Sequence, residues 1–180
     1  MDDSLITGNF LGDFVKGRKY QDYPEAIARG ILLHREIDSY TDHHPIHHQS
    51  KRRLGDKYGH YSGVAIDMFY DHLLAVNWAS YSDMPLSDFS QHVYGVLKAK
   101  ESLFPETARY VLKYMSQHDW LLHYQEMEGI SRSLQGISRR TSFQSNLENA
   151  ALDLEAHFPE FEQDFSSFFP EIISHTQTHF

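Results

Sequence analysis

The chain has 180 residues, of which 41% are hydrophobic and 14% aromatic, so it can bury the core of one domain and is neither disordered nor collagen-like. Its formal net charge of −9 disfavours a broad contact with nucleic acid or anionic lipid, because both contacts need a basic face. The absence of cysteine excludes disulfides, thiolate metal sites and cysteine nucleophiles, so any metal ion must be held by His, Asp or Glu.

No stretch of the sequence has the run of about 20 apolar residues that a membrane span requires. The first residues, Met1-Asp2-Asp3, are acidic and therefore unlike the basic start of a signal peptide. No linker-like or repeated segment divides the chain. We therefore expect one domain over residues 1–180, located in the cytoplasm and without a nucleic-acid or membrane partner.

Prolines mark the beginnings of the predicted helices. Pro24 and Pro85 precede segments of helical periodicity that run to about residues 41 and 100, and Pro105 and Pro159 mark further boundaries. Windows in which Val, Ile, Thr and aromatic residues alternate with a period of two are nearly absent. These patterns predict an all-α fold, a single compact helical domain of about seven or eight helices.

The helix predicted after Pro24 carries a stripe of mixed character. Ile27, Ile31, His34 and Asp38 follow one another at spacings of four, three and four, which places them on one face of a helix. The stripe therefore changes from aliphatic to polar halfway along. Gly30 lies beside this stripe. A glycine inside a helix lowers helix stability by about 1 kcal/mol relative to alanine, so its presence usually has a packing reason, and we expect another element to approach closely there.

A second stripe contains two carboxylates. It consists of Val64, Asp67, Asp71, Leu74 and Trp78, at spacings of three, four, three and four. The pattern predicts that both carboxylates point into an apolar seam. A buried carboxylate without a partner is costly, and no Lys or Arg occurs between positions 57 and 98 to pair with them locally.

A divalent cation would remove the repulsion between these two carboxylates, since side chains four residues apart on a helix can share one ion. His34 and Asp38 have the same spacing and could add an imidazole and a carboxylate from a facing helix, and His72 is a fifth candidate. Such donors suit Mn, Fe, Mg or Zn. The alternatives are a hydrogen-bonded core position for His34 and an ion pair between Asp38 and Arg35.

Four histidines follow the first of these helices, in the tract His43-His44-Pro45-Ile46-His47-His48. The tract has the composition of a metal site, but it lies just beyond the predicted end of the helix. We therefore expect a loop with solvated histidines.

Two adjacent arginines, Arg139 and Arg140, follow the short run Gly136-Ile137-Ser138. Their guanidinium groups could hold a phosphate through bidentate contacts, although surface charge is the simpler interpretation. The sequence has no nucleophile elbow, phosphate-binding loop or dinucleotide fingerprint, so serine-hydrolase, P-loop and Rossmann chemistry have no support.

Four ordered motifs cover most of the chain, from about residue 4 to the final helices. They are Gly8-Asn9-Phe10-Leu11-Gly12-Asp13-Phe14-Val15-Lys16-Gly17, Gly30-Ile31-Leu32-Leu33-His34-Arg35-Glu36-Ile37-Asp38 with Thr41-Asp42, Asp67-Met68-Phe69-Tyr70-Asp71-His72, and Gly136-Ile137-Ser138-Arg139-Arg140. Together they resemble the acyl carrier protein phosphodiesterase family. Its members are regarded as divergent relatives of the HD-type metal-dependent phosphohydrolases, which are all-helical.

The resemblance implies hydrolysis of the phosphodiester that joins 4′-phosphopantetheine to a serine of holo acyl carrier protein, the expected partner. It also implies a divalent metal, with Mn²⁺ favoured and Mg²⁺ or Fe²⁺ as alternatives. Carried onto this sequence position by position, it makes His34, Asp38, Asp67 and Asp71 candidate metal ligands, Asp13, His72 and Arg35 candidate catalytic residues, and Arg139 and Arg140 candidate phosphate contacts.

Two other functions stay open at this point: an HD-type phosphohydrolase acting on a nucleotide or another small phosphodiester, and a non-catalytic helical binding protein with a decayed site. Family members usually begin with a segment of the type Met-Asn-Phe/Tyr-Leu-Ala-His before the first motif. The printed sequence starts without it, so we expect one histidine of the site to be missing. Because acyl carrier proteins are strongly acidic, we also expect a local basic patch. The candidates are Lys51, Arg52 and Arg53, or Arg132 with Arg139 and Arg140.

Overall fold

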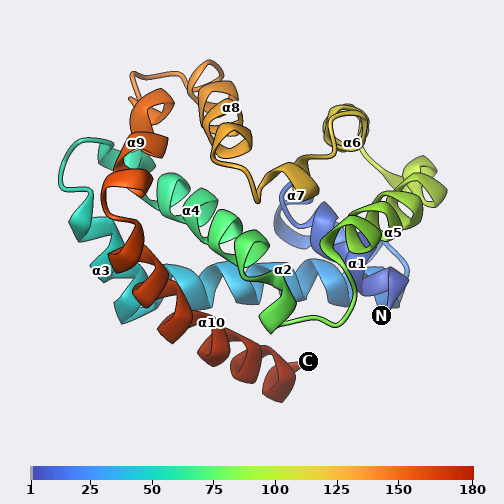
Figure 1. The fold of residues 1–180 in the computed structure, drawn as a ribbon. Coiled ribbons are helices and arrows are strands. Elements are labelled where there is room, and N and C mark those ends of the chain that lie inside the picture. Colours follow the sequence, from blue (N-terminus) through green and yellow to red (C-terminus); the bar gives the residue numbers. More distant parts are fainter. Residues whose placement is uncertain (1) are drawn as a thin grey trace.

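The computed structural model describes residues 2–180. Within this range the chain forms α-helices and short 3₁₀ helices and no strand (Figure 1). The α-helices are α1 (Asp3–Leu11), α2 (Glu25–His43), α3 (Pro45–Arg53), α4 (Ser62–Val76), α5 (Leu86–Ala99), α6 (Glu106–Gln117), α7 (Trp120–His123), α8 (Met127–Ser138), α9 (Ala150–Ala156) and α10 (Phe158–His179). The 3₁₀ helices are η1 (Gly17–Asp22), η2 (Gly59–Tyr61), η3 (Trp78–Ser80), η4 (Glu101–Leu103) and η5 (Leu147–Asn149).

The all-α prediction is confirmed, with more helices than expected. The periodicity of a sequence does not resolve segments as short as α7, which has 4 residues, or α9, which has 7. Pro24, Pro85 and Pro105 immediately precede α2, α5 and α6, and Pro159 lies in the first turn of α10, as predicted. None of the helices within residues 2–180 combines the length and apolar character needed to cross a lipid bilayer.

The prediction of a loop over the histidine tract is wrong. Pro45 is the first residue of α3, and the side chain of His44 caps this helix by accepting a hydrogen bond from a first-turn amide at 3.3 Å. His44 and His47 are buried, whereas His43 and His48 are exposed. The pattern was misread because a proline that follows the end of one helix can also begin the next.

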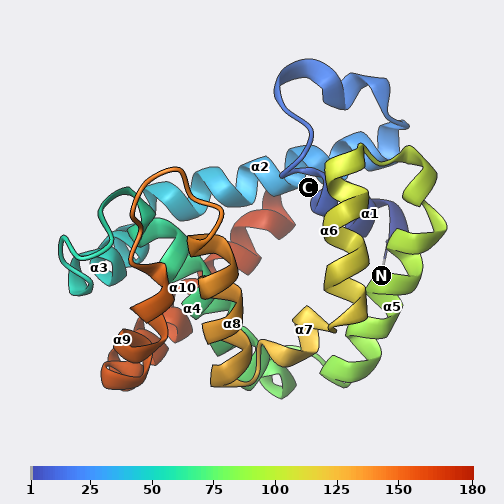
Figure 2. The ribbon, with the colours of Figure 1, turned by 90° about the horizontal axis from the view of Figure 1, so that it is seen from above.

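Two clusters of buried side chains form the core. The larger cluster joins α4, α8, α9 and α10, and the smaller joins α1, α2, α5 and α6. Figure 2 shows these two groups of helices side by side, with α2 running along both and α7 leading from one to the other. On α2, Ile31 is buried in the smaller cluster and Ile37 packs against the larger. His34 lies between them, so the stripe on α2 turns polar where the helix passes from one cluster to the other.

Helices α1 and α2 cross with a glycine on each side of the contact. A Cβ atom at Gly8 would lie 2.1 Å from the carbonyl oxygen of Ile27, and one at Gly30 would lie 2.7 Å from the carbonyl oxygen of Leu5. Any side chain at either position would therefore collide with the facing backbone. The close approach predicted at Gly30 is confirmed, and it packs the first two sequence motifs against each other.

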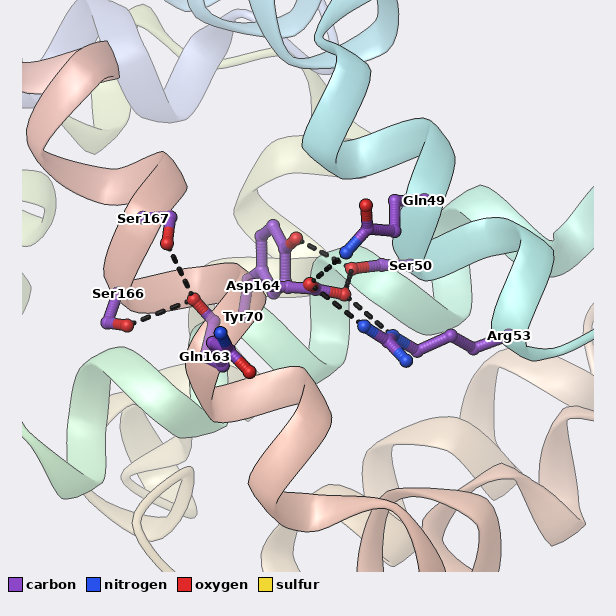
Figure 3. Close-up of polar contacts among 8 residues, drawn as sticks. All are labelled: Gln49, Ser50, Arg53, Tyr70, Gln163, Asp164, Ser166 and Ser167. Atoms are coloured by element: carbon purple, nitrogen blue, oxygen red, sulfur yellow. Dashed lines mark hydrogen bonds and ion pairs between the residues drawn. The ribbon is translucent and has the colours of Figure 1, made fainter.

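A buried ionic cluster holds α3 against α10 (Figure 3). The carboxylate of Asp164 accepts hydrogen bonds from Arg53 Nε at 2.9 Å, Ser50 Oγ at 2.8 Å and Gln49 Nε2 at 2.7 Å. Ser50 Oγ also lies 2.9 Å from the hydroxyl of Tyr70 on α4. The cluster therefore fixes α3 relative to both α4 and α10.

Candidate functional site

A histidine lies between two carboxylates where the end of α1 meets α2. His34 Nε2 is 3.1 Å from Oδ2 of Asp38, one turn further along α2, and 3.5 Å from Oδ1 of Asp13, just after α1. The imidazole is mostly buried, whereas the side chains of Asp13 and Asp38 are 72% and 60% exposed. The structure thus brings together three predicted site residues that come from two separate motifs.

The two carboxylates change the protonation of the imidazole. Hydrogen bonding to Asp13 and then to Asp38 raises the pKa of His34 to about 9, although burial acts in the opposite direction. The same contact with His34 lowers the pKa of Asp13. At neutral pH, without another cation nearby, His34 therefore holds a proton on Nε2 between two acceptors. Another positive charge could take the place of that proton.

Residues 12–16 are shaped to hold this arrangement. A Cβ atom at Gly12 would lie 2.2 Å from Cγ of His34, so the ring fits only because the position is glycine. Arg35 Nη2 donates to the carbonyl oxygen of Val15 at 2.8 Å, and its guanidinium lies 5.3 Å from the centre of an aromatic ring of η1. Arg35, a predicted catalytic residue, is placed here as an anchor of the segment that carries Asp13.

A second pair of carboxylates lies on α4. The prediction that Asp67 and Asp71 point into an apolar seam is wrong, because both side chains are exposed, that of Asp67 to 59%. The residues immediately before and after each of them in the sequence are buried. The acidic face of α4 therefore looks away from the core, where a ligand can reach it.

The charge of the pair is set by its surroundings. Asp71 is in contact with solvent, but the surrounding protein desolvates its carboxylate. This desolvation, together with the negative charge of Asp67, raises the pKa of Asp71 to about 7. At neutral pH this carboxyl group is divided between its protonated and ionised forms. A cation beside the pair would favour the ionised form.

His47 on α3 lies beside the carboxylate of Asp67, and the sequence analysis did not predict it as a site residue. Its ring is fully buried, and neither ring nitrogen has a hydrogen-bond partner. Nε2 lies 3.3 Å from Oδ1 of Asp67, close enough for an ionic contact but too poorly aligned for a hydrogen bond. A signal was present in the sequence, since His47 and Ser50 have the spacing of one helix face after Pro45.

His72 does not share the acidic face of α4. It is buried on another side of the helix, where its Nδ1 donates to the carbonyl oxygen of Tyr124 at 2.7 Å and its ring packs edge-on against Phe158. Burial lowers the pKa of His72, and the carbonyl of Tyr124 offsets only part of this effect. In this structure the residue ties α4 to the end of α7.

The predicted phosphate contacts lie at the C-terminal end of α8. Arg139 follows the last residue of the helix and is exposed. Arg140 Nε donates to the carbonyl oxygen of Gly136 at 3.0 Å, and the side chain lines a cavity of about 700 Å³ between α6, α7 and α8. Within residues 2–180 neither arginine forms an ion pair, so their remaining N–H groups can bind an anion.

The donors suit a divalent cation by type, since imidazole nitrogens and carboxylate oxygens are the ligands expected for Mn, Fe or Mg. They occur in two groups, Asp13, His34 and Asp38 at one place and His47, Asp67 and Asp71 at the other. Across the described part of the chain no hydrogen bond or ion pair joins the two groups, and no three such side chains close around a single point as arranged here. The buried, unpartnered ring of His47 and the carboxylates around His34 show that both groups could accept a positive charge.

Comparison with known proteins agrees with the motifs. The family model described as acyl carrier protein phosphodiesterase matches residues 1–172. A protein of that name from Yersinia enterocolitica is 31% identical over 176 residues, which cover 97% of this chain and 91% of the relative. Relatives of the same name from an Enterobacter species and from Pectobacterium atrosepticum are 31% and 30% identical, and the alignments cover 95% and 98% of this chain and 89% and 92% of the relatives. No solved structure matches the chain. Since the motifs and the matched family model extend over nearly the whole sequence, the chain belongs to the acyl carrier protein phosphodiesterase family.

Proposed function

We propose that this chain hydrolyses the phosphodiester bond of holo acyl carrier protein and releases 4′-phosphopantetheine and the apo carrier. The observation that carries the proposal is the position of His34 between Asp13 and Asp38, which the glycine at position 12 makes possible. These residues come from motifs of the family to which the chain belongs. The family membership supports the reaction, and the open acidic groups support a site where it can occur. We place the reaction in the cytoplasm.

The proposed site uses a divalent cation, with Mn²⁺ favoured and Mg²⁺ or Fe²⁺ as alternatives. His34 and Asp38 on α2, and Asp67 and Asp71 on α4, are the proposed ligands, either of one ion between the two helices or of one ion at each pair, since such ions bind imidazole and carboxylate donors. When bound, such an ion lowers the pKa of water toward neutrality and neutralises charge that develops on the phosphate.

The chain's own residues contribute proton handling and phosphate binding. Asp13, a predicted catalytic residue whose carboxylate is 72% exposed, can accept a proton from the attacking water and return one to the leaving serine oxygen. Asp13 holds the Nε2 side of His34 and so fixes the orientation of its ring. Arg139 and Arg140 supply guanidinium donors to the non-bridging oxygens of the phosphate.

A basic surface for the acidic carrier protein is available on α3. Of the three consecutive basic residues there, Arg53 is occupied by Asp164, which leaves Lys51 and Arg52. The pKa of His48, on the same helix, is lowered by desolvation and then by nearby positive charges that include Lys51 and Arg52, which supports a local concentration of positive charge. In a chain of net charge −9, this patch can orient an acidic partner.

The test is release of 4′-phosphopantetheine from holo acyl carrier protein, followed by mass spectrometry. Chelation should abolish turnover and Mn²⁺ should restore it. Asp67→Asn should lower kcat by about 100-fold or more, because it removes a carboxylate from the proposed metal set. Asp56→Asn is the matched control, since Asp56 is exposed and makes no ion pair within residues 2–180, and it should leave turnover unchanged.

A substrate panel separates the proposal from its alternatives. Full turnover in chelator would contradict the metal-dependent scheme. Cleavage of nucleotides or bis-p-nitrophenyl phosphate without any release from the carrier protein would instead assign the chain to another phosphodiester substrate. If the purified protein neither binds metal nor hydrolyses any of these substrates, the reading as a non-catalytic binding protein is the correct one.

A further inference from the structure

The cavity between α6, α7 and α8 lies outside the two groups of acidic residues. Its volume is about 700 Å³, and α4 contributes one residue to its wall, Met68. Figure 2 shows α6 and α8 facing each other with α7 between them. Two tyrosines of α6, Tyr110 and Tyr114, form an aromatic pair with their ring centres 4.8 Å apart, and Arg132 and Arg140 come from the side of α8. The walls are therefore aromatic, with cationic groups on one side.

The cavity borders the acidic face of α4. Met68, in its wall, directly follows Asp67 in the sequence. Tyr124, also in its wall, has a raised pKa, chiefly because of burial and secondly because of the negative charge of Asp71. Both observations place the cavity next to the carboxylates of the proposed reaction centre.

Asp119, in the cavity wall, is held by contacts within the protein. Its Oδ2 accepts a hydrogen bond from Gln91 Nε2 at 3.1 Å, and its Oδ1 is buried. The hydroxyl of Tyr94 accepts from the amide of Leu121 at 3.0 Å, and its pKa is raised chiefly by burial and further by Asp119. The carboxylate of Asp119 therefore fixes this part of the wall, and the polar groups open to a ligand come from the side of α8.

We propose that this cavity binds the pantetheine arm of the substrate, an inference that rests on the proposed function. The arm is a flexible chain with two amide groups, a hydroxyl and a terminal thiol. Its amide carbonyl groups match the N–H donors of Arg132, and its aliphatic parts match the tyrosine wall. The cavity volume lies within the range of about 300–1,000 Å³ that is usual for sites of small ligands. The scissile phosphate then lies at the end of the cavity that α4 borders.

Glycine positions allow the cavity to be filled without disturbing the core. Gly136 lines the cavity from α8, and a Cβ atom placed there would have no other atom within 4 Å. Gly95 on α5 has the same open surroundings, is exposed and lies outside the cavity. Gly136→Phe and Gly95→Phe are therefore a matched pair, since each replaces a helical glycine by the same large residue and neither should prevent folding.

The experiment compares two substrates. Gly136→Phe should raise KM for holo acyl carrier protein by about tenfold or more, while cleavage of bis-p-nitrophenyl phosphate, which has no arm, stays within about twofold of wild type. Gly95→Phe should leave both unchanged. Free pantetheine, which has no phosphate, should bind to the wild type and to Gly95→Phe in ligand-observed NMR and should not bind to Gly136→Phe.

The outcomes separate this proposal from the proposed function. An unchanged KM for the carrier protein in Gly136→Phe, equal losses on both substrates, or no binding of pantetheine to the wild type would overturn the cavity assignment. If the wild type binds pantetheine in the cavity but does not hydrolyse the carrier protein, the proposed function fails and the assignment stands. Should Gly136→Phe fail to fold, Tyr110→Ala replaces it, because this side chain is 60% exposed and its loss should weaken pantetheine binding without affecting the core.

Discussion

The imidazole of His34 occupies the space that a side chain at Gly12 would need. An ideal Cβ at Gly12 would lie 2.2 Å from Cγ, 2.3 Å from Cδ2 and 2.5 Å from Cβ of His34. The backbone of Gly12 is in the ordinary right-handed helical region, so the glycine is required by this contact and not by its conformation.

Gly12→Ala should therefore displace the ring of His34 from Asp13 and Asp38. We expect kcat to fall by about 100-fold, because a small shift of a catalytic group has a large effect on rate, and the free energy of unfolding to fall by about 1–3 kcal/mol through overpacking. Steady-state assays and urea denaturation measure the two effects. The control is Gly95→Ala, which has open space at Cβ and should gain up to about 1 kcal/mol in stability. Wild-type activity in Gly12→Ala would show that the position of His34 is unimportant for turnover.

Because Arg53 pairs with the buried carboxylate of Asp164, removing the arginine should lower the stability of the fold strongly and affect turnover little. Arg53→Ala should lower the free energy of unfolding by about 3 kcal/mol, because it leaves the carboxylate of Asp164, which is 4% exposed, without its cation. Arg52→Ala should change it by no more than about 0.5 kcal/mol, since the neighbouring arginine is exposed and makes no ion pair within residues 2–180. Equal urea midpoints for the two variants would refute the structural role of the cluster.

The same carboxylate predicts how stability depends on pH. Burial raises the pKa of Asp164, but Arg53, Ser50 and Gln49 together lower it by more, so the pKa in the folded protein is below its usual value. The unfolded chain therefore binds more protons at acidic pH, and the stabilisation that is fully present above the unfolded pKa is lost as the pH falls through the folded one. Urea unfolding between about pH 5 and 2 should show this decline. Asp164→Asn should be less stable than wild type at pH 7 and should show a weaker dependence on pH in this window, and parallel curves would exclude the explanation.

The features predicted correctly from the sequence are those for which a local pattern of residues is compatible with only one structure. A helix over the stripe from Ile27 to Asp38 was predicted from its period, and the close contact at Gly30 from the cost of a glycine inside a helix. The pairing of Asp13 with His34 could not be read from spacing, because it depends on the crossing of α1 over α2. The resemblance of the motifs to a family named both residues as site candidates but did not predict their contact.

The features predicted incorrectly depend on how whole helices are packed. Helix α4 is apolar on most of its surface, so periodicity alone could not show that Asp67 and Asp71 occupy its open face and not the seam. The burial of His47 depends on the docking of α3 against α10, which is fixed by contacts more than 100 residues apart in the sequence, such as that between Ser50 and Asp164. No local pattern contains that information.

From the contact between His47 and Asp67 we expect that replacing His47 by leucine lowers activity without lowering stability. His47→Leu removes a fully buried imidazole whose two nitrogens have no hydrogen-bond partner, so the free energy of unfolding should stay constant or rise by about 1 kcal/mol. The variant also removes the group that faces Oδ1 of Asp67 at 3.3 Å. Since residues that orient a ligating carboxylate are worth about 10- to 100-fold in activity, kcat should fall by about tenfold.

A conservative variant distinguishes positioning from packing. His47→Gln keeps an N–H donor close to the position of Nε2 and should restore most of kcat, whereas His48→Leu, on the exposed side of the same helix, should not change it. Thermal unfolding with and without Mn²⁺ supplies a readout independent of turnover, because a misoriented Asp67 should reduce the stabilisation gained from the ion in His47→Leu alone. If His47→Leu lowers stability and leaves kcat and the effect of Mn²⁺ unchanged, the buried imidazole acts only in packing, and Asp67 is held in place by α4 itself.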